Sequence, residues 1–406
     1  MNDIFLKNGN STKTYHELVE AINSSEFYYP VIRTNDIFEL FKNIIIGVIY
    51  NQELTLLDSD ISSNEIVEID SNLINHKKYL NQVISVSLEV IMQKIMVSDA
   101  SITIFTSGTT GQPKKVSHSI HNLIRSVRTG INHKDDVWGF AYNPTHMSGL
   151  QVFFQAILNK NSIVNIFGQQ RTDVLASLKA NEVTHLSGTP TFFRLLLPTD
   201  IVIDSIKRVT FGGEKSDQKL YDNVLHMFPN AKITNVYAST EAGSLFAAKN
   251  DCFQIPNSLL SQIKIDDGEL LIHKSLLGHS DSFTYKGDYY CSGDIIEWVD
   301  QEKGLFRFKS RKNEMVNVGG YKVNPAEVED LISSMDGIRQ VVVYGKPNSI
   351  LGNVLCADIQ LENGVNIKET DIRKKLRDRL QDFKIPRRIK FVTEFSVTRT
   401  GKIKRI

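Results

Sequence analysis

A loop rich in glycine and hydroxyl groups is the first segment whose residue types indicate chemistry. The apolar run Ile102–Phe105 predicts a buried strand, and it leads into residues that favour neither helix nor strand: Thr106, Ser107, Gly108, Thr109, Thr110 and Gly111. The backbone N–H groups and hydroxyls of such a loop can face an anion, and Lys114 adds a point charge. The loop is not a P-loop, because Pro113 stands where G-x-x-x-x-G-K-S/T requires its second glycine. The simpler alternative is a surface turn without a ligand.

Two further segments place small or polar residues directly after predicted strands. The glycine pair in Phe211–Glu214 would let a flat ligand approach the backbone closely, although a tight turn is the simpler interpretation of this segment alone. In the second segment, Tyr237 could stack on a base and the Thr240 hydroxyl could bond a phosphate oxygen. The Glu241 carboxylate could hold Mg²⁺ beside substrate phosphates. Alone, these residues are a weak signal.

The remaining candidates lie in segments that also have ordinary explanations. Asp294 follows Ser-Gly in a pattern typical of a turn, and Arg311 opens a segment that reads R-K-N-E-M-V-N-V-G-G-Y. Lys402 lies in a basic terminal tail, which in most proteins is solvated. His146 lies in N-P-T-H-M-S-G, and an isolated histidine is more often structural than catalytic.

Taken together and in this order, the segments resemble the motifs of the adenylate-forming superfamily. This superfamily comprises acyl-CoA and aryl-CoA ligases, peptide-synthetase adenylation domains and firefly luciferase. The most specific match is T-S-G-T-T-G-Q-P-K-K-V, and the resemblance runs from about Thr103 to the C-terminus. The chain departs from the family pattern at Lys115 and Val236, where glycine is usual or frequent, and at Ser396, where proline is usual.

The resemblance implies a nucleotide site. The loop from Thr106 to Gly111, with Lys114, would clamp the β- and γ-phosphates of ATP. The adenine would be bound by Gly213, Glu214 and Tyr237. The ribose side of the nucleotide would be bound by Asp294 and Arg311.

The resemblance also implies the catalytic residues. Thr240 would contact the α-phosphate and Glu241 would hold Mg²⁺. Lys402 would hold the carboxylate and the α-phosphate while the acyl-adenylate forms, and His146 would gate the acyl pocket. The apolar residues after His146 and Glu241 are either pocket lining or core: Val152, Phe153, Phe154, Ala242, Leu245 and Phe246.

The implied function is ATP-dependent activation of a small carboxylic acid, with release of pyrophosphate and transfer of the acyl group to coenzyme A. The cofactors would be ATP, Mg²⁺ and coenzyme A. An alternative is a stand-alone adenylation enzyme that loads an acyl or aryl carrier protein on its phosphopantetheine, and a remote alternative is an inactive nucleotide-binding homologue. No aspartate lies in Asn143–Gly149 to pair an ammonium group, which argues against an amino-acid substrate.

Short apolar runs alternate with helical patterns over about the first 300 residues, which predicts an α/β domain with mainly parallel sheets. Strands in quick succession after Gly268 predict a small β-barrel-like part. We expect a large ATP- and acid-binding domain at 1–309, a hinge at 310–313 and a small, mobile α+β domain at 314–406 that carries Lys402. Asn313 would act in the hinge, and Gly319 and Gly320 would leave room for a pantetheine arm.

Composition limits the class of protein. With 47 basic and 46 acidic residues, the chain lacks the basic excess of proteins that bind nucleic acids or anionic membranes. The widely spaced Cys252, Cys291 and Cys356 predict no disulfide framework, and the N-terminus lacks a signal-peptide pattern. The apolar run Ile44–Tyr50 is too short to span a membrane and predicts a buried strand. We therefore expect a soluble cytoplasmic enzyme.

Overall fold

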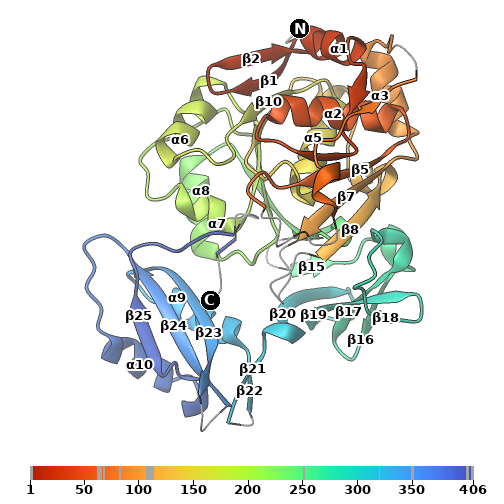
Figure 1. Cartoon of the computed structure of the whole chain (residues 1–406). Coiled ribbons are helices and arrows are strands. Elements are labelled where there is room, and N and C mark those ends of the chain that lie inside the picture. Colours follow the sequence, from red (N-terminus) through yellow and green to blue (C-terminus); the bar gives the residue numbers. More distant parts are fainter. Residues whose placement is uncertain are drawn as a thin grey trace. The chain divides into compact units, whose positions relative to one another are not determined.

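The computed structural model describes residues 3–61, 66, 69–81, 84–106, 114–249, 252–319, 321–348, 352–398 and 402–403. The chain forms two compact units (Figure 1). Unit 1 comprises Met1–Gln262, Ile272–Tyr290 and Arg399–Lys402, and unit 2 comprises Ile263–Leu271, Cys291–Thr398 and Ile403–Ile406.

Unit 1 is built around a largely parallel sheet. Its strands β1 and β9 to β13 run parallel in the order β13-β12-β11-β9-β10-β1, and β2, β14 and β15 extend it with antiparallel pairing. The strands are β1 (Ile4–Asn8), β2 (Ser11–Thr14), β9 (Val137–Phe140), β10 (Ser162–Asn165), β11 (His185–Gly188), β12 (Arg208–Gly212), β13 (Lys232–Ser239), β14 (Gly243–Lys249) and β15 (Cys252–Gln254). The predicted α/β domain with mainly parallel strands is confirmed.

Helices cover both faces of this sheet, because its strands are apolar on both sides. The helices are α5 (Met147–Ile157), α6 (Arg171–Ala180), α7 (Pro190–Leu195) and α8 (Gln218–Met227). In Figure 1, α6, α7 and α8 lie on one side of the sheet and α5 on the other. Leu178 of α6 and Val224 of α8 are buried in one hydrophobic core, and Phe153 and Phe154 of α5 are buried in another.

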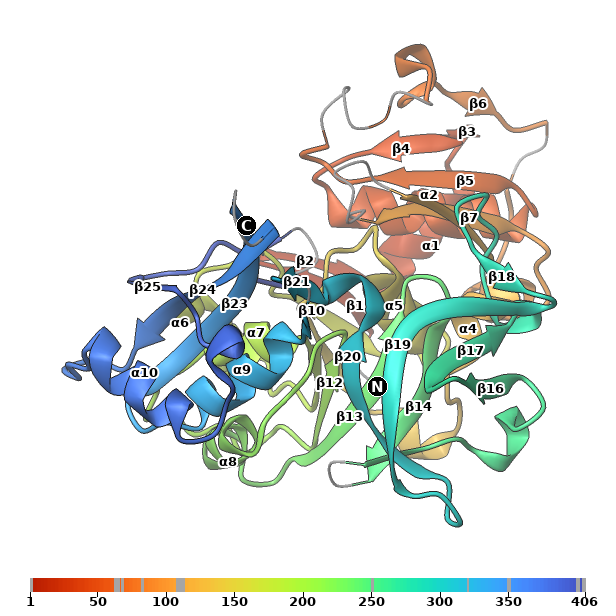
Figure 2. The ribbon, with the colours of Figure 1, turned by 90° about the horizontal axis from the view of Figure 1, so that it is seen from below.

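A second sheet of unit 1 carries the start of the phosphate-loop motif. Strands β4, β5 and β7 are parallel, and β8 is antiparallel to β7. They are β4 (Val31–Arg33), β5 (Glu53–Leu57), β7 (Ser101–Thr106) and β8 (Lys114–Ser119), with helices α1 (Tyr15–Asn23), α2 (Ile37–Ile49), α3 (Leu88–Met96) and α4 (Ile120–Ile124) and a small pair β3 (Phe27–Tyr28) and β6 (Lys78–Tyr79). Figure 2 shows β4 and β5 side by side, with α2 along their face.

The strand predicted at Ile44–Tyr50 is wrong, because most of this run lies in helix α2. The helix begins at the side chain of Asp36, which accepts hydrogen bonds from the backbone N–H groups of Phe38 and Glu39. Ile44, Ile45, Ile46 and Val48 are all buried, so this second half of the helix is apolar on every side and shows no 3.6-residue pattern, whereas the first half carries the partly exposed pair Glu39 and Lys42. A short apolar run of this kind does not distinguish a buried strand from a buried helix.

Unit 2 contains an antiparallel pair of strands and a small α+β domain. Strand β19 (Tyr289–Asp300), whose first two residues belong to unit 1, pairs with β20 (Leu305–Arg311). Unit 2 also contains β16 (Ile263–Asp266) and the start of β17 (Glu269–His273), whereas β18 (Tyr285–Lys286) belongs to unit 1. The small domain comprises β21 (Val316–Val318), β22 (Tyr321–Val323), α9 (Pro325–Ser333), β23 (Ile338–Asn348), β24 (Gly352–Leu361), α10 (Glu369–Arg377) and β25 (Arg388–Phe391). Val328 and Ile332 of α9 and Ile372 of α10 are buried with the sheet residues in one core, as the predicted α+β unit requires.

Two further expectations concern the whole chain. Among the residues that the structure describes, no helix is both long and apolar enough to cross a membrane. In the described part of the chain, Cys252, Cys291 and Cys356 form no disulfide.

Candidate active site

The carboxyl ends of the parallel strands in unit 1 bring several predicted residues to one edge of the sheet. His146 follows β9, Gly213 and Glu214 follow β12, and Thr240 and Glu241 follow β13. Strand β9 lies between β10 and β11, so the chain continues from it first to one side and then to the other. Ligands of open α/β sheets bind outside the carboxyl ends of the strands at such a switch point.

His146 is held by a buried carboxylate that the sequence did not point to. Its Nε2 lies 3.0 Å from each carboxylate oxygen of Asp58, which follows β5 in the second sheet. Asp58 Oδ1 also accepts hydrogen bonds from Asn143 Nδ2, at 3.2 Å, and from the Thr145 hydroxyl. The side chains of Asp58 and His146 are only 10% and 12% exposed. Asp58 therefore fixes the loop between β9 and α5 together with its histidine.

The phosphate-loop motif starts at the same edge of the second sheet as Asp58. Strands β5 and β7 are parallel neighbours, so their carboxyl ends, which precede Asp58 and the loop, lie at one edge. The backbone of Thr106 pairs with Lys114 across the β7–β8 ladder. The predicted residues Ser107, Gly108, Thr109, Thr110 and Gly111 lie outside the described residues.

The turn after β13 has a fixed backbone and unengaged side chains. The carbonyl oxygens of Thr240 and Glu241 accept hydrogen bonds from His118 Nε2 and from the backbone N–H of Gly278, both at 2.8 Å. The carbonyl oxygen of Ala242 accepts one from Arg125 Nη2. Among the described residues, neither the Thr240 hydroxyl nor the Glu241 carboxylate has a hydrogen-bond or ion-pair partner, and both side chains are partly exposed. Both are available to a ligand.

His118 is neutral because it is fully buried. Burial, with a smaller effect of the positive charge of Arg125, lowers the pKa of His118 to about 4, although the hydrogen bond with Thr240 acts in the opposite direction. A carbonyl oxygen can only accept, so the contact with Thr240 places the ring proton on Nε2. Burial also lowers the pKa of the Arg125 guanidinium.

Lys402 lies beside Gly213 within unit 1. Gly213 has φ +81°, a conformation that favours glycine, and a Cβ there would lie 3.3 Å from Cε and 3.7 Å from Nζ of Lys402. The Glu214 carboxylate accepts a hydrogen bond of 3.0 Å from the backbone N–H of Thr191 in α7. Burial and the charge of Glu214 raise the pKa of the Tyr142 hydroxyl. The structure thus places a cation and a glycine backbone together at the edge where β12 ends.

Tyr237 forms part of an aromatic stack. Its ring lies 5.1 Å from that of Phe246 on the neighbouring strand β14, with the ring planes at 16°. Phe246 is buried, and so are Phe153 and Phe154 on α5, which belong to the hydrophobic core. Of the two interpretations that the sequence left open for these phenylalanines, the structure supports core.

Asp294 and Arg311 form an ion pair in unit 2. They face each other across the β19–β20 ladder, and Arg311 Nε donates to Asp294 Oδ1 at 2.7 Å. Asp294 is buried, whereas the Arg311 side chain is half exposed. Beside them, Lys312 Nζ lies 3.0 Å from Glu269 Oε2. Asn313 lies in a short 3₁₀ turn. Gly319 directly follows β21 and has φ +59°, and Gly320 lies outside the described residues.

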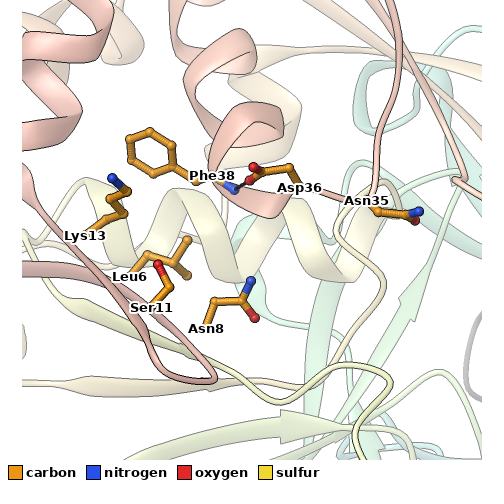
Figure 3. A pocket seen from close by; sticks show the side chains of 7 residues that line it. All are labelled: Leu6, Asn8, Ser11, Lys13, Asn35, Asp36 and Phe38. Atoms are coloured by element: carbon orange, nitrogen blue, oxygen red, sulfur yellow. Dashed lines mark hydrogen bonds between the residues drawn. The ribbon is translucent and has the colours of Figure 1, made fainter.

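A surface hollow of about 460 Å³ lies elsewhere in unit 1, between the β1–β2 hairpin and the start of α2 (Figure 3). Its lining residues are Leu6, Asn8, Ser11, Lys13, Asn35, Asp36 and Phe38. Asp36 is occupied with capping α2, and Lys13 lies over the Phe38 ring at 5.4 Å. No predicted site residue lines this hollow.

The residues present fit a nucleotide with its magnesium ion. Mg²⁺ prefers oxygen ligands and is usually bound by one or two carboxylates together with substrate phosphates, and Glu241 offers a carboxylate without a competing partner in the described part of the chain. Within that part, no group of three or more His, Cys, Asp or Glu side chains is arranged to hold a metal ion by itself. Glu241 would therefore hold the ion jointly with phosphate oxygens.

Sequence reasoning missed three residues of this region: Asp58, His118 and Arg125. Asp58 follows an apolar strand, as ligand-binding carboxylates often do, and this position was a usable signal. His118 and Arg125 contact a segment that is 122 and 117 residues away in the chain, and no local pattern marks such contacts.

Two family sequence models match this chain. The sequence model of the AMP-binding enzyme family matches residues 49–262, and that of the AMP-binding enzyme C-terminal domain matches residues 327–402. A 2-succinylbenzoate–CoA ligase of Staphylococcus epidermidis is 26% identical over 337 residues, which cover 76% of this chain and 69% of that protein. The 4-hydroxybutyrate–CoA ligase 1 of Metallosphaera sedula is 26% identical over 349 residues, with 76% and 61% covered.

Solved structures show the same fold. ATP-bound MatB from Rhodopseudomonas palustris matches with a TM-score of 0.76 and 17% identity, over 99% of this chain and 95% of that one. The o-succinylbenzoate CoA synthetase of Bacillus subtilis, in complex with its acyl-adenylate intermediate, matches with a TM-score of 0.73 and 18% identity, over 99% and 94%. The chain spans about two thirds of the length of the curated relatives it matches, from 61% to 69%. With more than half of its residues matched by the family's main model, this chain belongs to the AMP-binding enzyme family.

Proposed function

We propose that this chain activates a carboxylic acid with ATP and transfers the acyl group to the thiol of coenzyme A. Family membership and the CoA-ligase names of the curated relatives support this proposal. The observation that carries it is the edge of unit 1 where β12 and β13 end: Lys402 lies beside Gly213 after β12, and Glu241 follows β13 with a carboxylate that has no partner among the described residues.

In the first step, a carboxylate oxygen attacks the α-phosphorus of ATP and pyrophosphate leaves. Both reactants are anions, so the site must offset their repulsion and hold them in line. Lys402 would contact the carboxylate and the α-phosphate, Thr240 would donate to the α-phosphate, and Lys114 would hold the outer phosphates with the phosphate loop. Mg²⁺ on Glu241 would neutralise part of the phosphate charge.

The remaining predicted residues would hold and align the reactants. Gly213, Glu214 and Tyr237 would form the adenine side of the site, with Glu214 fixed by its contact with α7. Asp294 and Arg311 would bind the ribose side. His146, which Asp58 fixes, would stand at the acyl pocket.

In the second step, the thiol of coenzyme A attacks the acyl carbon and AMP leaves. We propose that residues 310–313 form a hinge between a large domain, residues 1–309, and a small domain, residues 314–406. Rotation about this hinge would withdraw Lys402 and present the glycine pair that begins at Gly319 to the pantetheine arm.

Acid-dependent exchange of labelled pyrophosphate into ATP tests the first step. A panel of aryl, fatty, hydroxy and amino acids is assayed with the wild-type protein and with Lys402→Ala. We expect exchange with one class of acid and a loss of about 10²–10³-fold in the variant, the usual cost of removing one preorganised charge contact. Bound ATP without exchange in the presence of any acid would contradict the proposal.

The acceptor is tested with the acid that supports exchange. Coenzyme A and a holo carrier protein are supplied separately, and thioester formation is followed by mass spectrometry. Acyl-CoA as the product supports the proposal. Product on the carrier protein alone would replace coenzyme A by phosphopantetheine as the acceptor.

A further inference from the structure

We propose that His118 and Arg125 are positioning residues that hold the Thr240–Ala242 turn in its ligand-binding conformation. The proposal rests on the proposed function insofar as this turn contacts MgATP. Neither residue would contact the nucleotide, since both act through the backbone of the turn. Neither belongs to the motifs on which the sequence resemblance rests.

Three consecutive carbonyl oxygens of the turn accept hydrogen bonds from three different residues. Those of Thr240, Glu241 and Ala242 accept from His118, from the backbone of Gly278 and from Arg125, respectively. A rotation of any of these peptides would leave a buried or partly buried donor without its acceptor, and such an unsatisfied group is costly.

His118 is built into its place by the segment that contains Gly278. The His118 ring is fully buried, and a Cβ on Gly278 would lie 2.5 Å from its Cε1. The residue at 278 therefore has to be glycine for the ring to reach Thr240. Within the described residues, Nδ1 of His118 has no hydrogen-bond partner, so the contact with the Thr240 carbonyl is the one polar anchor of this ring.

Arg125 ties the same turn to the segment before Gly278. Its Nη1 donates to the carbonyl oxygen of Leu276 at 3.0 Å, while its Nη2 donates to that of Ala242. Asn122, on helix α4, which ends directly before Arg125, donates to the carbonyl oxygen of Leu277 at 2.7 Å. The Arg125 guanidinium thus connects the Thr240–Ala242 turn to the segment that contains Leu276. Side chains from β8 to Arg125 donate hydrogen bonds to both segments.

This arrangement links the turn to the phosphate-loop hairpin. His118 lies in β8, the strand that begins at Lys114 directly after the loop. Lys114 and His118 are four residues apart and so lie on the same face of the strand. A shift of β8 would move Lys114 and the Thr240–Glu241 turn together, which keeps the two groups that face the phosphates in register.

The test compares two substitutions at one position. His118→Gln keeps an N–H donor close to the place of Nε2, whereas His118→Leu removes it. The readouts are the Kd for MgATP by isothermal titration calorimetry and the rate of pyrophosphate exchange. We expect His118→Leu to raise the Kd about 5- to 30-fold, the equivalent of one lost hydrogen bond to a buried group, and His118→Gln to stay within about threefold of wild type.

His185→Leu is the matched control, because His185 is also buried but lies at the start of β11, at the end of the strand away from the site. We expect this variant to lower the melting temperature without changing the Kd for MgATP. If His118→Leu and the control change the Kd equally, or if His118→Leu changes only the melting temperature, the proposal is wrong.

A double-mutant cycle separates positioning from general damage. If His118 acts through the turn, His118→Leu should add less than about twofold to the Kd in a Glu241→Ala background, because coupled residues are not additive. Full additivity would contradict the proposal. Wild-type protein that binds MgATP but exchanges no pyrophosphate would overturn the proposed function and leave this test in force, whereas protein that binds no MgATP would overturn both.

Discussion

The two predicted nucleotide-contacting regions are prepared in opposite ways. In the Thr240–Ala242 turn, the backbone carbonyls are occupied and the side chains of Thr240 and Glu241 have no partner among the described residues. In unit 2, the side chains of Asp294 and Arg311 are occupied by each other. The first region is ready for a ligand, and the second must exchange an internal contact for one with the nucleotide.

This difference has energetic consequences. A preorganised group needs no rearrangement when charge develops, so its loss is felt fully in the rate. A group that leaves an ion pair to meet a ligand gains only the difference between the two contacts. The largest effects of substitution should therefore come from the turn and smaller ones from the ion pair.

Glu241→Gln is expected to give the largest effect. The amide keeps the size of the side chain but removes the charge that Mg²⁺ requires, so pyrophosphate exchange should fall about 10²–10³-fold. The Mg²⁺ concentration for half-maximal rate should rise as well. An exchange rate within threefold of wild type would show that the unengaged carboxylate is not a metal ligand.

Asp294→Asn should have the next largest effect. It breaks the charge pair with Arg311 and weakens the contact with the ribose, and we expect the KM for ATP to rise about 10- to 100-fold, the range for hydrogen bonds of charged groups. If Arg311→Gln in the Asp294→Asn background costs nothing more, the pair acts as a unit. Equal losses from Asp294→Asn and Glu241→Gln would contradict the contrast between the two regions.

Acid should destabilise unit 1 before unit 2, because all ten histidines of the chain belong to unit 1. Burial lowers the pKa of His185 to about 4. The positive charges of Arg208, His133 and Lys207 also lower this pKa, whereas the negative charge of Asp136 raises it. The unfolded chain binds this proton near pH 6.5 and the folded chain does not, so stability is lost as the pH falls from about 6.5 to 4.

Hydrogen exchange of each unit at neutral pH and at pH 5, corrected for intrinsic rates, measures this difference. Unit 1 should open more readily at pH 5, and His185→Gln should remove part of the change. Acid opening confined to unit 2 would contradict the assignment.

Asp58→Asn should affect the acid rather than the nucleotide. It removes the charge that fixes His146, and we expect the KM for the acid to rise about tenfold while the Kd for MgATP stays within twofold. Breaking one partner of a buried pair also lowers stability, so the melting temperature serves as the control. A change confined to the Kd for MgATP would show that Asp58 does not act at the acyl pocket.

Lys312→Met should have the smallest effect. Its ammonium pairs with Glu269 beside Arg311, but the side chain is 64% exposed, and such pairs contribute about 0–1 kcal/mol. We expect the KM for ATP to change less than twofold. A loss as large as that of Asp294→Asn would mean that the neighbouring pair, rather than Asp294 with Arg311, serves the nucleotide.

Much of the fold was predictable because its signals are local. The strands β10, β11 and β12 are short apolar runs bounded by loops, and α6 and α8 show helical patterns between them. The second half of helix α2 was mistaken for a strand because burial on all sides removes, in this run, the amphipathic pattern on which the distinction depends.

The site was predictable only where its residues belong to contiguous motifs. Thr240 and Glu241 lie in such a motif, and so does His146. Asp58 and His118 contact these motifs from 88 and 122 residues away, through sheet edges that meet only in the folded chain. Their identification required the structure.

Transfer of an oxygen atom from the acid to AMP tests the central claim most directly. The acid that supports exchange is labelled with ¹⁸O in its carboxylate and incubated with the enzyme, ATP, Mg²⁺ and coenzyme A. The ¹⁸O content of the AMP and the pyrophosphate is then measured by mass spectrometry. If a carboxylate oxygen attacks the α-phosphorus, each AMP carries one ¹⁸O and the pyrophosphate carries none. Unlabelled AMP, or label in phosphate or pyrophosphate, would contradict the formation of an acyl-adenylate.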